Sequence, residues 1–328
     1  MMKKNTKVKK KESVKLKVVK TMNIFNIPVK DIYIFPNKNF LINADGIYKI
    51  YNDKNMCTRT KKDNHYKNIN IIDNDSFLCL KDDNKLMNIN LKTGKVTKIY
   101  EFPQRILNIL YYKNKYISLG EDMKIDIWEK NFSNNQIQLL TTIALTKSKT
   151  IINIIPEKNI LIVSIDEPIA DHMNNGQYTY FYDLSSFKMI NKLTGFIIEK
   201  IYKLNDDLYL IPEYSYCEGF SYLRIYDFTK NEIIKAIKND DYKFSWNLEI
   251  LTIPEKKIIL LAGTNYTENG NTLYKDIIVM NYDFEKIFVM NNVHYRDIQG
   301  IKMYQKKEKE YLILTYSEDG AVNVLSLI

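Results

Sequence analysis

The sequence predicts an all-β protein, a seven-bladed β-propeller closed by an N-terminal strand that completes the last blade. Three observations predict this fold. Two short apolar segments joined by a polar turn recur seven times along the 328 residues. These segments are too short for helices. The last repeat is one strand short, and a segment near the start of the chain has the pattern of the missing strand.

The turns of the hairpins define the repeat. In each unit a segment rich in Ile, Tyr, Val and Phe is followed by a turn of polar residues or Pro and by a second apolar segment, as in IYIF-PNKN-FLI and ILTI-PEKK-IILL. The seven turns begin at Pro36, Asp73, Lys113, Pro156, Asn205, Pro254 and Gln305. Apolar segments of this length between turn residues are typical of β-hairpins, so seven hairpins are predicted.

Two more strands follow the hairpins. Asp45-Gly46 leads to the third segment IYKIYN, and Asp319-Gly320 leads to AVNVLSL. A fourth segment usually follows, as in KVTKIYEF and QIQLLTTI. Four antiparallel strands per unit, without helical periodicity, indicate small sheets arranged around an axis. The alternative is a large β-sandwich, which predicts neither seven units nor a last unit that lacks one strand.

The end of the chain supports closure of the ring. The seventh unit ends at Ile328, directly after its third strand, and would leave an unpaired edge. Residues 13–20, SVKLKVVK, alternate apolar and polar side chains and precede the first inner strand. We therefore expect Val14 to Val19 to lie beside Ala321 to Leu327. The predicted domain spans residues 13–328, and residues 1–12 form a basic flexible tail.

Each third strand ends in a recurring pair of residues. The pairs are Tyr51-Asn52, Ile89-Asn90, Trp128-Glu129, Tyr182-Asp183, Tyr226-Asp227, Met280-Asn281 and Leu325-Ser326. In these pairs, and in residues 88–95 and 317–327, the chain resembles the WD-repeat β-propeller family, whose third strands end in an aromatic residue and a small acidic one. The resemblance covers nearly everything after residue 13. It implies a non-catalytic scaffold that docks proteins within a larger assembly.

Histidine usage departs from that family. The chain has no Gly-His dipeptide and only three His residues. We therefore expect the hydrogen-bonded His network of many family members to be absent. Blade packing is then expected to depend on apolar contacts and on cross-strand aromatic pairs.

Composition excludes several classes of protein. The chain has 48 Lys and Arg against 39 Asp and Glu, 45% hydrophobic residues, 10 Gly and 7 Pro, so it is neither collagenous nor wholly disordered. Cys57, Cys79 and Cys217 are far apart and form no C-x-x-C motif, so neither a disulfide framework nor a zinc site is indicated. No apolar stretch of 18 residues occurs, so no membrane span is expected. We expect a cytoplasmic or nuclear protein.

Alternating strand directions divide the turns between two faces of the propeller. Turns between strands one and two and between strands three and four lie on the first face. Turns between strands two and three, and the connections between blades, lie on the second face. The first face collects Lys38, Lys113, Lys115, Lys158, Lys256, Lys257, Lys306, Lys307 and Lys309. We expect this face to be basic. The alternative is that exposed turns in a Lys-rich chain contain Lys whether or not the face binds a partner.

The tail emerges on the first face and is the most basic segment. Residues 1–20 contain nine Lys and one Glu. The candidate residues for an anionic partner are Lys3, Lys4, Lys7, Lys9, Lys10 and Lys11. The tail is interpreted either as an arm that binds RNA, DNA or anionic lipid headgroups or as a solubilising extension. An RNA-associated or ribonucleoprotein factor is therefore the alternative function.

The second face carries the candidate protein-binding site. Its longest turns occur in blades four, five and six, at residues 167–177, 213–219 and 263–272, and contain five acidic residues but no Lys or Arg. The candidate contacts are Glu167, Asp171, His172, Tyr214, Tyr216, Glu218, Tyr266 and Glu268. Tyr provides contact area, and carboxylates select a Lys- or Arg-rich protein. The alternative is that these loops are disordered insertions.

No catalytic chemistry is predicted. We expect His65, His172 and His294 to be surface residues on the second face, and the spacing of His172 to Cys217 specifies neither a Cys/His pair nor a metal site. The chain has no Gly-rich phosphate-binding loop. We expect a protein that is not an enzyme, with no cofactor, no metal and no small-molecule substrate.

Overall fold

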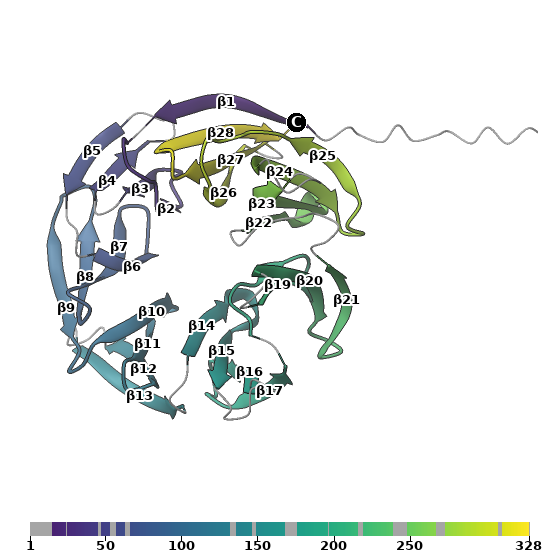
Figure 1. The fold of residues 1–328 in the computed structure, drawn as a ribbon. Coiled ribbons are helices and arrows are strands. Elements are labelled where there is room, and N and C mark those ends of the chain that lie inside the picture. The colour runs from purple at the N-terminus through teal and green to yellow at the C-terminus, as the bar shows by residue number, and fades with distance from the viewer. Residues whose placement is uncertain are drawn as a thin grey trace, which may run out of the picture.

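The computed structural model describes residues 15–23, 25–44, 47–52, 57–62, 66–131, 136–145, 149–167, 176–195, 197–215, 219–238, 248–266, 273–307 and 310–327. These residues form seven four-stranded antiparallel sheets. The sheets are arranged in a ring around a central channel, with the first strand of each blade innermost (Figure 1). The predicted seven-bladed β-propeller is confirmed.

Consecutive strands build the first six blades from the axis outward. Blades one to three consist of β2 (Asp31–Ile34), β3 (Phe40–Ala44), β4 (Ile47–Tyr51), β5 (Cys57–Lys62); β6 (Tyr66–Ile71), β7 (Ser76–Lys81), β8 (Lys85–Asn90), β9 (Val96–Glu101); β10 (Ile106–Tyr112), β11 (Lys115–Gly120), β12 (Lys124–Asn131), β13 (Gln136–Ala144). Blades four to six consist of β14 (Lys149–Ile155), β15 (Ile160–Glu167), β16 (Gly176–Asp183), β17 (Met189–Thr194); β18 (Tyr202–Lys203), β19 (Leu208–Ser215), β20 (Gly219–Asp227), β21 (Glu232–Lys238); β22 (Glu249–Ile253), β23 (Ile258–Tyr266), β24 (Leu273–Asn281), β25 (Lys286–Met290).

Blade seven joins the two ends of the chain. Its sheet has the order β1-β28-β27-β26, formed by β1 (Leu16–Asn23), β26 (Ile298–Lys307), β27 (Glu310–Ser317) and β28 (Ala321–Leu327). β1 pairs antiparallel with β28 from Leu16 opposite Leu327 to Asn23 opposite Ala321. The predicted closure is confirmed, although the strand runs from Leu16 to Asn23 and residues 13 and 14 lie outside the described residues.

Each blade buries both faces of its sheet against its neighbours. Seven clusters of buried apolar side chains fill the seven contacts between adjacent blades. Phe181 of blade four, for example, stacks on Tyr226 of blade five with ring centroids 5.7 Å apart. A middle strand such as β27 is therefore buried along nearly its whole length, whereas outer strand β21 alternates between exposed and half-buried residues because it lies at the rim.

Two details of the strands differ from the sequence prediction. The turn expected at Gln305 lies beyond Lys307, because Gln305 still pairs with Tyr311 and Lys307 with Glu310. The two PEK turns, Pro156–Lys158 and Pro254–Lys256, form short 3-10 helices. Within the described part of the chain, no helix is long and apolar enough to cross a membrane.

The closing strand is held by two side chains that belong to different cores. Leu16, 6% exposed, packs in the cluster between blades six and seven, and Met22, 7% exposed, packs in the cluster between blades seven and one. We expect Leu16→Ala and Met22→Ala each to lower the free energy of unfolding by about 2 to 4 kcal/mol, because each leaves a cavity at a blade contact. Urea unfolding measures this loss.

Val19→Ala is the matched control on the same strand. Val19 is 59% exposed, so its truncation should change the free energy of unfolding by less than about 0.5 kcal/mol. Equal losses for Val19→Ala and Met22→Ala would contradict the role of β1 in closing the ring.

Candidate functional site

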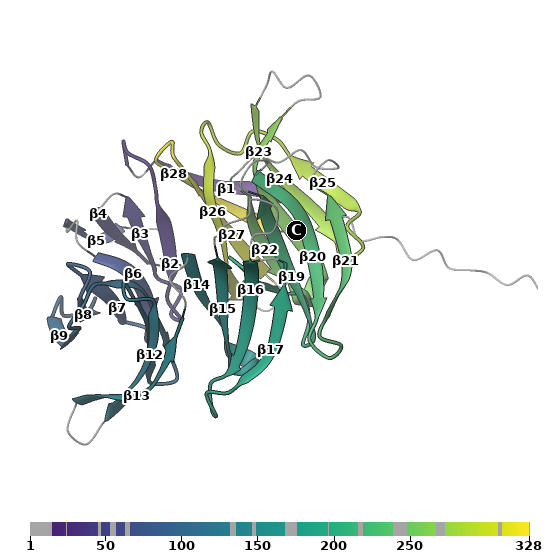
Figure 2. The ribbon, with the colours of Figure 1, turned by 60° about the horizontal axis from the view of Figure 1, so that its bottom comes forward.

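The central hairpins of blades five and six extend beyond their inner strands on the second face. In blade six the inner strand β22 pairs only as far as Ala262, whereas β23 and β24 continue to Tyr266 and Leu273. In blade five, pairing beyond the inner strand extends from Leu210 to Ser215. In blades two, three and seven the second strand ends where pairing with the inner strand ends. Figure 2 shows the β23–β24 hairpin projecting from this face.

The predicted contact residues belong to these extended hairpins and to blade four. Glu167, Tyr214 and Tyr266 lie at or next to the second-face ends of β15, β19 and β23, in three consecutive blades. The structure thus brings the three segments to one face. The remaining predicted contacts lie outside the described residues: Asp171, His172, Tyr216, Glu218 and Glu268.

The hairpin of blade five also carries charged residues that pair with each other. Arg224 Nε donates a hydrogen bond to Glu213 Oε2, and the Arg224 guanidinium lies 4.9 Å from the ring centre of Tyr222. One of the five carboxylates that the sequence assigns to these loops is therefore neutralised within the blade.

The connection between blades six and seven is fixed by a buried histidine. His294 Nδ1 lies 3.1 Å from Asp319 Oδ2, and Nε2 lies 2.9 Å from the hydroxyl of Thr315. The His294 side chain is 0% exposed. Two expectations are therefore wrong: a hydrogen-bonded His network is present, and His294 does not face the surface. The side chain turns inward because β27 and the turn after it provide a hydroxyl and a carboxylate at the right distances.

The order carboxylate, imidazole, hydroxyl is also that of a catalytic triad, but burial gives it another role. The Asp319 carboxylate has only acceptor oxygens, so His294 Nδ1–H donates to it. Burial alone would raise the pKa of Asp319, but the hydrogen bonds from His294 and from the backbone N–H groups of Ala321 and Tyr295 outweigh it and lower the pKa to about 2. The buried side chains of His294 and Thr315 thus tie the connection to β27.

Similar polar ties occur in blades three and four. Trp128 Nε1 donates to the hydroxyl of Ser118 over 2.9 Å, and Gln104 in the preceding connection donates to Asp122 over 2.8 Å. In blade four, Ser164 accepts from the backbone N–H of Ile198 over 3.0 Å. Trp128 belongs to the third-strand pair Trp128-Glu129. Its ring packs in an apolar cluster, and its Nε1–H donates to Ser118 on the neighbouring strand.

The first face carries a small excess of positive charge in its described turns. Those turns contain nine Lys and eight acidic residues. Some are paired, as Lys158 with Asp207 at 3.3 Å, and beside the turns Lys115 of β11 pairs with Glu129 of β12 at 3.4 Å. The tail residues Lys3, Lys4, Lys7, Lys9, Lys10 and Lys11 lie outside the described residues. Binding of RNA or another anionic partner through the tail therefore stays a prediction.

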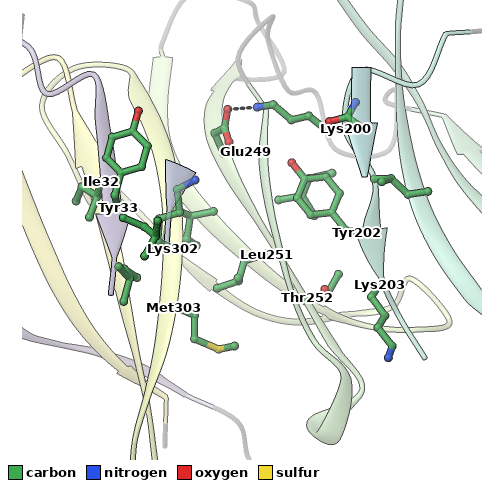
Figure 3. Close-up of a pocket in the computed structure, with 16 residues that line it drawn as sticks. Ile32, Tyr33, Lys200, Tyr202, Lys203, Glu249, Leu251, Thr252, Lys302 and Met303 are labelled. Carbon is green, nitrogen blue, oxygen red and sulfur yellow. Dashed lines mark hydrogen bonds and ion pairs between the residues drawn. The ribbon is translucent and has the colours of Figure 1, made fainter. Parts of the chain in front are cut away.

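The central channel contains a cavity of about 690 Å³ that is lined by the inner strands. Each of its three lysines lies near a carboxylate: Lys200 lies 2.5 Å from Glu249, Lys203 lies 2.9 Å from Asp206, and Lys302 lies 3.7 Å from Asp31. Figure 3 shows the Lys200–Glu249 pair above apolar side chains that include Leu251. The lining itself contains three Lys and one Glu, since Asp31 and Asp206 lie outside it.

The fold defines a class of protein, the seven-bladed β-propeller, here with extended hairpins in blades five and six. No protein-family model and no curated protein matches the chain. Among the residues that the structure describes, no group of three or more His, Cys, Asp or Glu side chains is placed to hold a metal ion.

The loss of folding stability at acidic pH tests the buried cluster of His294, Thr315 and Asp319. Asp319 has a pKa of about 2 in the folded chain against an ordinary 3.8, so its stabilising contribution is full above about pH 4 and is lost as the pH falls toward 2. We expect Asp319→Asn to lower the free energy of unfolding at pH 7 by about 2 kcal/mol and to remove that part of the acid loss. Urea unfolding between pH 2 and pH 7 measures both.

Asp206→Asn is the control, because the Asp206 side chain is 94% exposed. Its loss of stability should stay below about 0.5 kcal/mol. If the two variants lose the same free energy, the His294–Asp319 contact does not stabilise the connection.

Proposed function

We propose that the protein is a non-catalytic scaffold that docks other proteins on its second face at blades four to six. The observation that carries this proposal is the extension of the β19–β20 and β23–β24 hairpins beyond their inner strands in adjacent blades. Loops on a rigid scaffold are the usual site of binding, since the sheets hold position while the loops supply contacts. The ring of seven sheets provides that scaffold.

The composition of the three loops favours a Lys- or Arg-rich partner. They contain acidic residues and tyrosines without Lys or Arg, in a chain that has 48 basic residues. Carboxylates steer a basic partner and set its orientation, and tyrosines supply contact area. Because Glu213 pairs with Arg224, the carboxylates available to a partner are those of Glu167, Asp171, Glu218 and Glu268.

We further infer that the chain is a divergent member of the WD-repeat family acting in the cytoplasm or nucleus. Seven blades, closure by an N-terminal strand and the repeated third-strand pairs support this assignment. The contacts of His294 with Asp319 and Thr315 also support it, because the resemblance to that family implies a hydrogen-bonded histidine network.

Reversing the charge of the candidate face tests the proposal. The variant replaces Glu167, Asp171, Glu218 and Glu268 by Lys. We expect recovery of basic partner proteins to fall at least tenfold, since like charges across an interface oppose docking. Affinity purification followed by mass spectrometry, with equal amounts of folded bait, measures the recovery.

A second variant with the same change of charge is the control. It replaces four exposed first-face residues, Asp206, Glu232, Glu255 and Glu285, by Lys. Its recovery of partners should equal that of the unchanged protein. Partners retained by the second-face variant, or lost equally from both variants, would overturn the assignment of the docking face.

A further inference from the structure

The connection from Asn291 to Asp297 is a rigid platform on the second face. Val293 N–H donates to the carbonyl of Lys275 in blade six over 2.8 Å, and the Asn323 side chain in blade seven donates to the carbonyl of Val293. The Asn292 N–H donates to Asp276 Oδ1 over 3.0 Å. With His294 buried beneath it, this segment is bonded to both neighbouring blades along most of its length.

The end of the platform is held in the same way. Tyr295 N–H donates to Asp319 over 2.9 Å, the hydroxyl of Ser317 donates to the carbonyl of Arg296 over 3.0 Å, and Asp297 pairs with Lys275 at 2.5 Å. The backbone at Tyr295 and Arg296 therefore has little freedom left to lose on binding a partner. Such preorganisation lowers the entropic cost of association.

On this fixed backbone the side chain of Tyr295 projects wholly into solvent. Tyr295 is 97% exposed, whereas every other tyrosine whose side chain the structure describes is buried or half-buried. The remaining tyrosines contribute their rings to blade contacts, as Tyr226 does against Phe181. The Tyr295 ring makes no such contribution, so folding alone does not require an aromatic residue here.

The neighbouring Arg296 is exposed and, among the described residues, forms no ion pair. The carboxylates around it are engaged elsewhere. Asp297 pairs with Lys275, Glu318 accepts from Gln299 over 3.0 Å, and Asp319 accepts from His294. The Arg296 guanidinium thus offers its donors to solvent, next to an exposed aromatic ring.

We propose that Tyr295 and Arg296 form the anchor of a second docking site, for a protein segment that carries a carboxylate next to an apolar side chain. Tyr and Arg are the residues that most often dominate binding energy at interfaces, and Arg recognises carboxylates through paired hydrogen bonds. The anchor lies in the connection that is hydrogen-bonded to β24 at Lys275 and Asp276. It rests on the proposed scaffold function. Its partner segment is acidic, whereas the loops of blades four to six select a basic partner.

Selection of peptides from a random 12-residue phage library on the purified full chain tests the anchor. Peptides with Asp or Glu next to an aromatic or aliphatic residue should be enriched. Their affinity, measured by fluorescence anisotropy with synthetic peptides, should fall at least tenfold in Tyr295→Ala and in Arg296→Glu, and Tyr295→Phe should retain it. The urea midpoint of Tyr295→Ala should not change, because the ring makes no packing contacts.

Met189→Ala removes an exposed side chain of an outer strand and is the matched control, with unchanged peptide affinity expected. No enrichment, enriched peptides without acidic residues, or affinities that survive both Tyr295→Ala and Arg296→Glu would each overturn the anchor. The four-residue charge reversal of blades four to six separates the two proposals. If this variant still binds the acidic peptides and also retains basic partners, the anchor is supported and the proposed basic-partner site is wrong.

Discussion

Each small sheet of this protein has two apolar faces, and each face is buried only when the adjacent sheet is in place. The clusters between blades show this dependence, since the cluster that contains Leu16 draws on both blade six and blade seven. A ring with one blade incomplete would expose an apolar face and an unpaired edge together. Pairing of β1 with β28 prevents both, and so the ends of the chain stabilise every blade between them.

Closure also determines where polar groups are available. Because strands are buried on both faces within the blades, hydrogen-bonding side chains in the core must be satisfied locally. His294, Thr315 and Asp319 meet this requirement in blade seven, and Trp128 with Ser118 meets it in blade three. The contacts of His294 fix the connection between blades six and seven on the second face, whereas the hairpins of blades five and six extend beyond their inner strands. The same face therefore combines fixed connections with projecting hairpins, which suits the recognition of proteins.

The first face and the central channel differ from the second face in the arrangement of their charges. In the described turns of the first face the charges nearly balance, and in the channel Lys200 and Lys302 are paired with carboxylates. The described turns of the first face therefore present no concentrated charge of one sign. The features that remain without an internal role are the hairpins of blades five and six and the exposed Tyr295 with Arg296, and all of them lie on the second face.

The repeat of turn residues and apolar segments determined the number of blades and the closing strand. Hairpin signals are local in the sequence, and the last unit lacked the one strand that the start of the chain could supply. Tertiary structure alone decided the role of His294. Its partners Thr315 and Asp319 lie over 20 residues away, and no dipeptide signal marks the contact. Tyr295 likewise carries no signal in the sequence, where it is one of 25 tyrosines. Its exposure follows from the bonds that hold the backbone on either side, and such bonds exist only after the blades have packed.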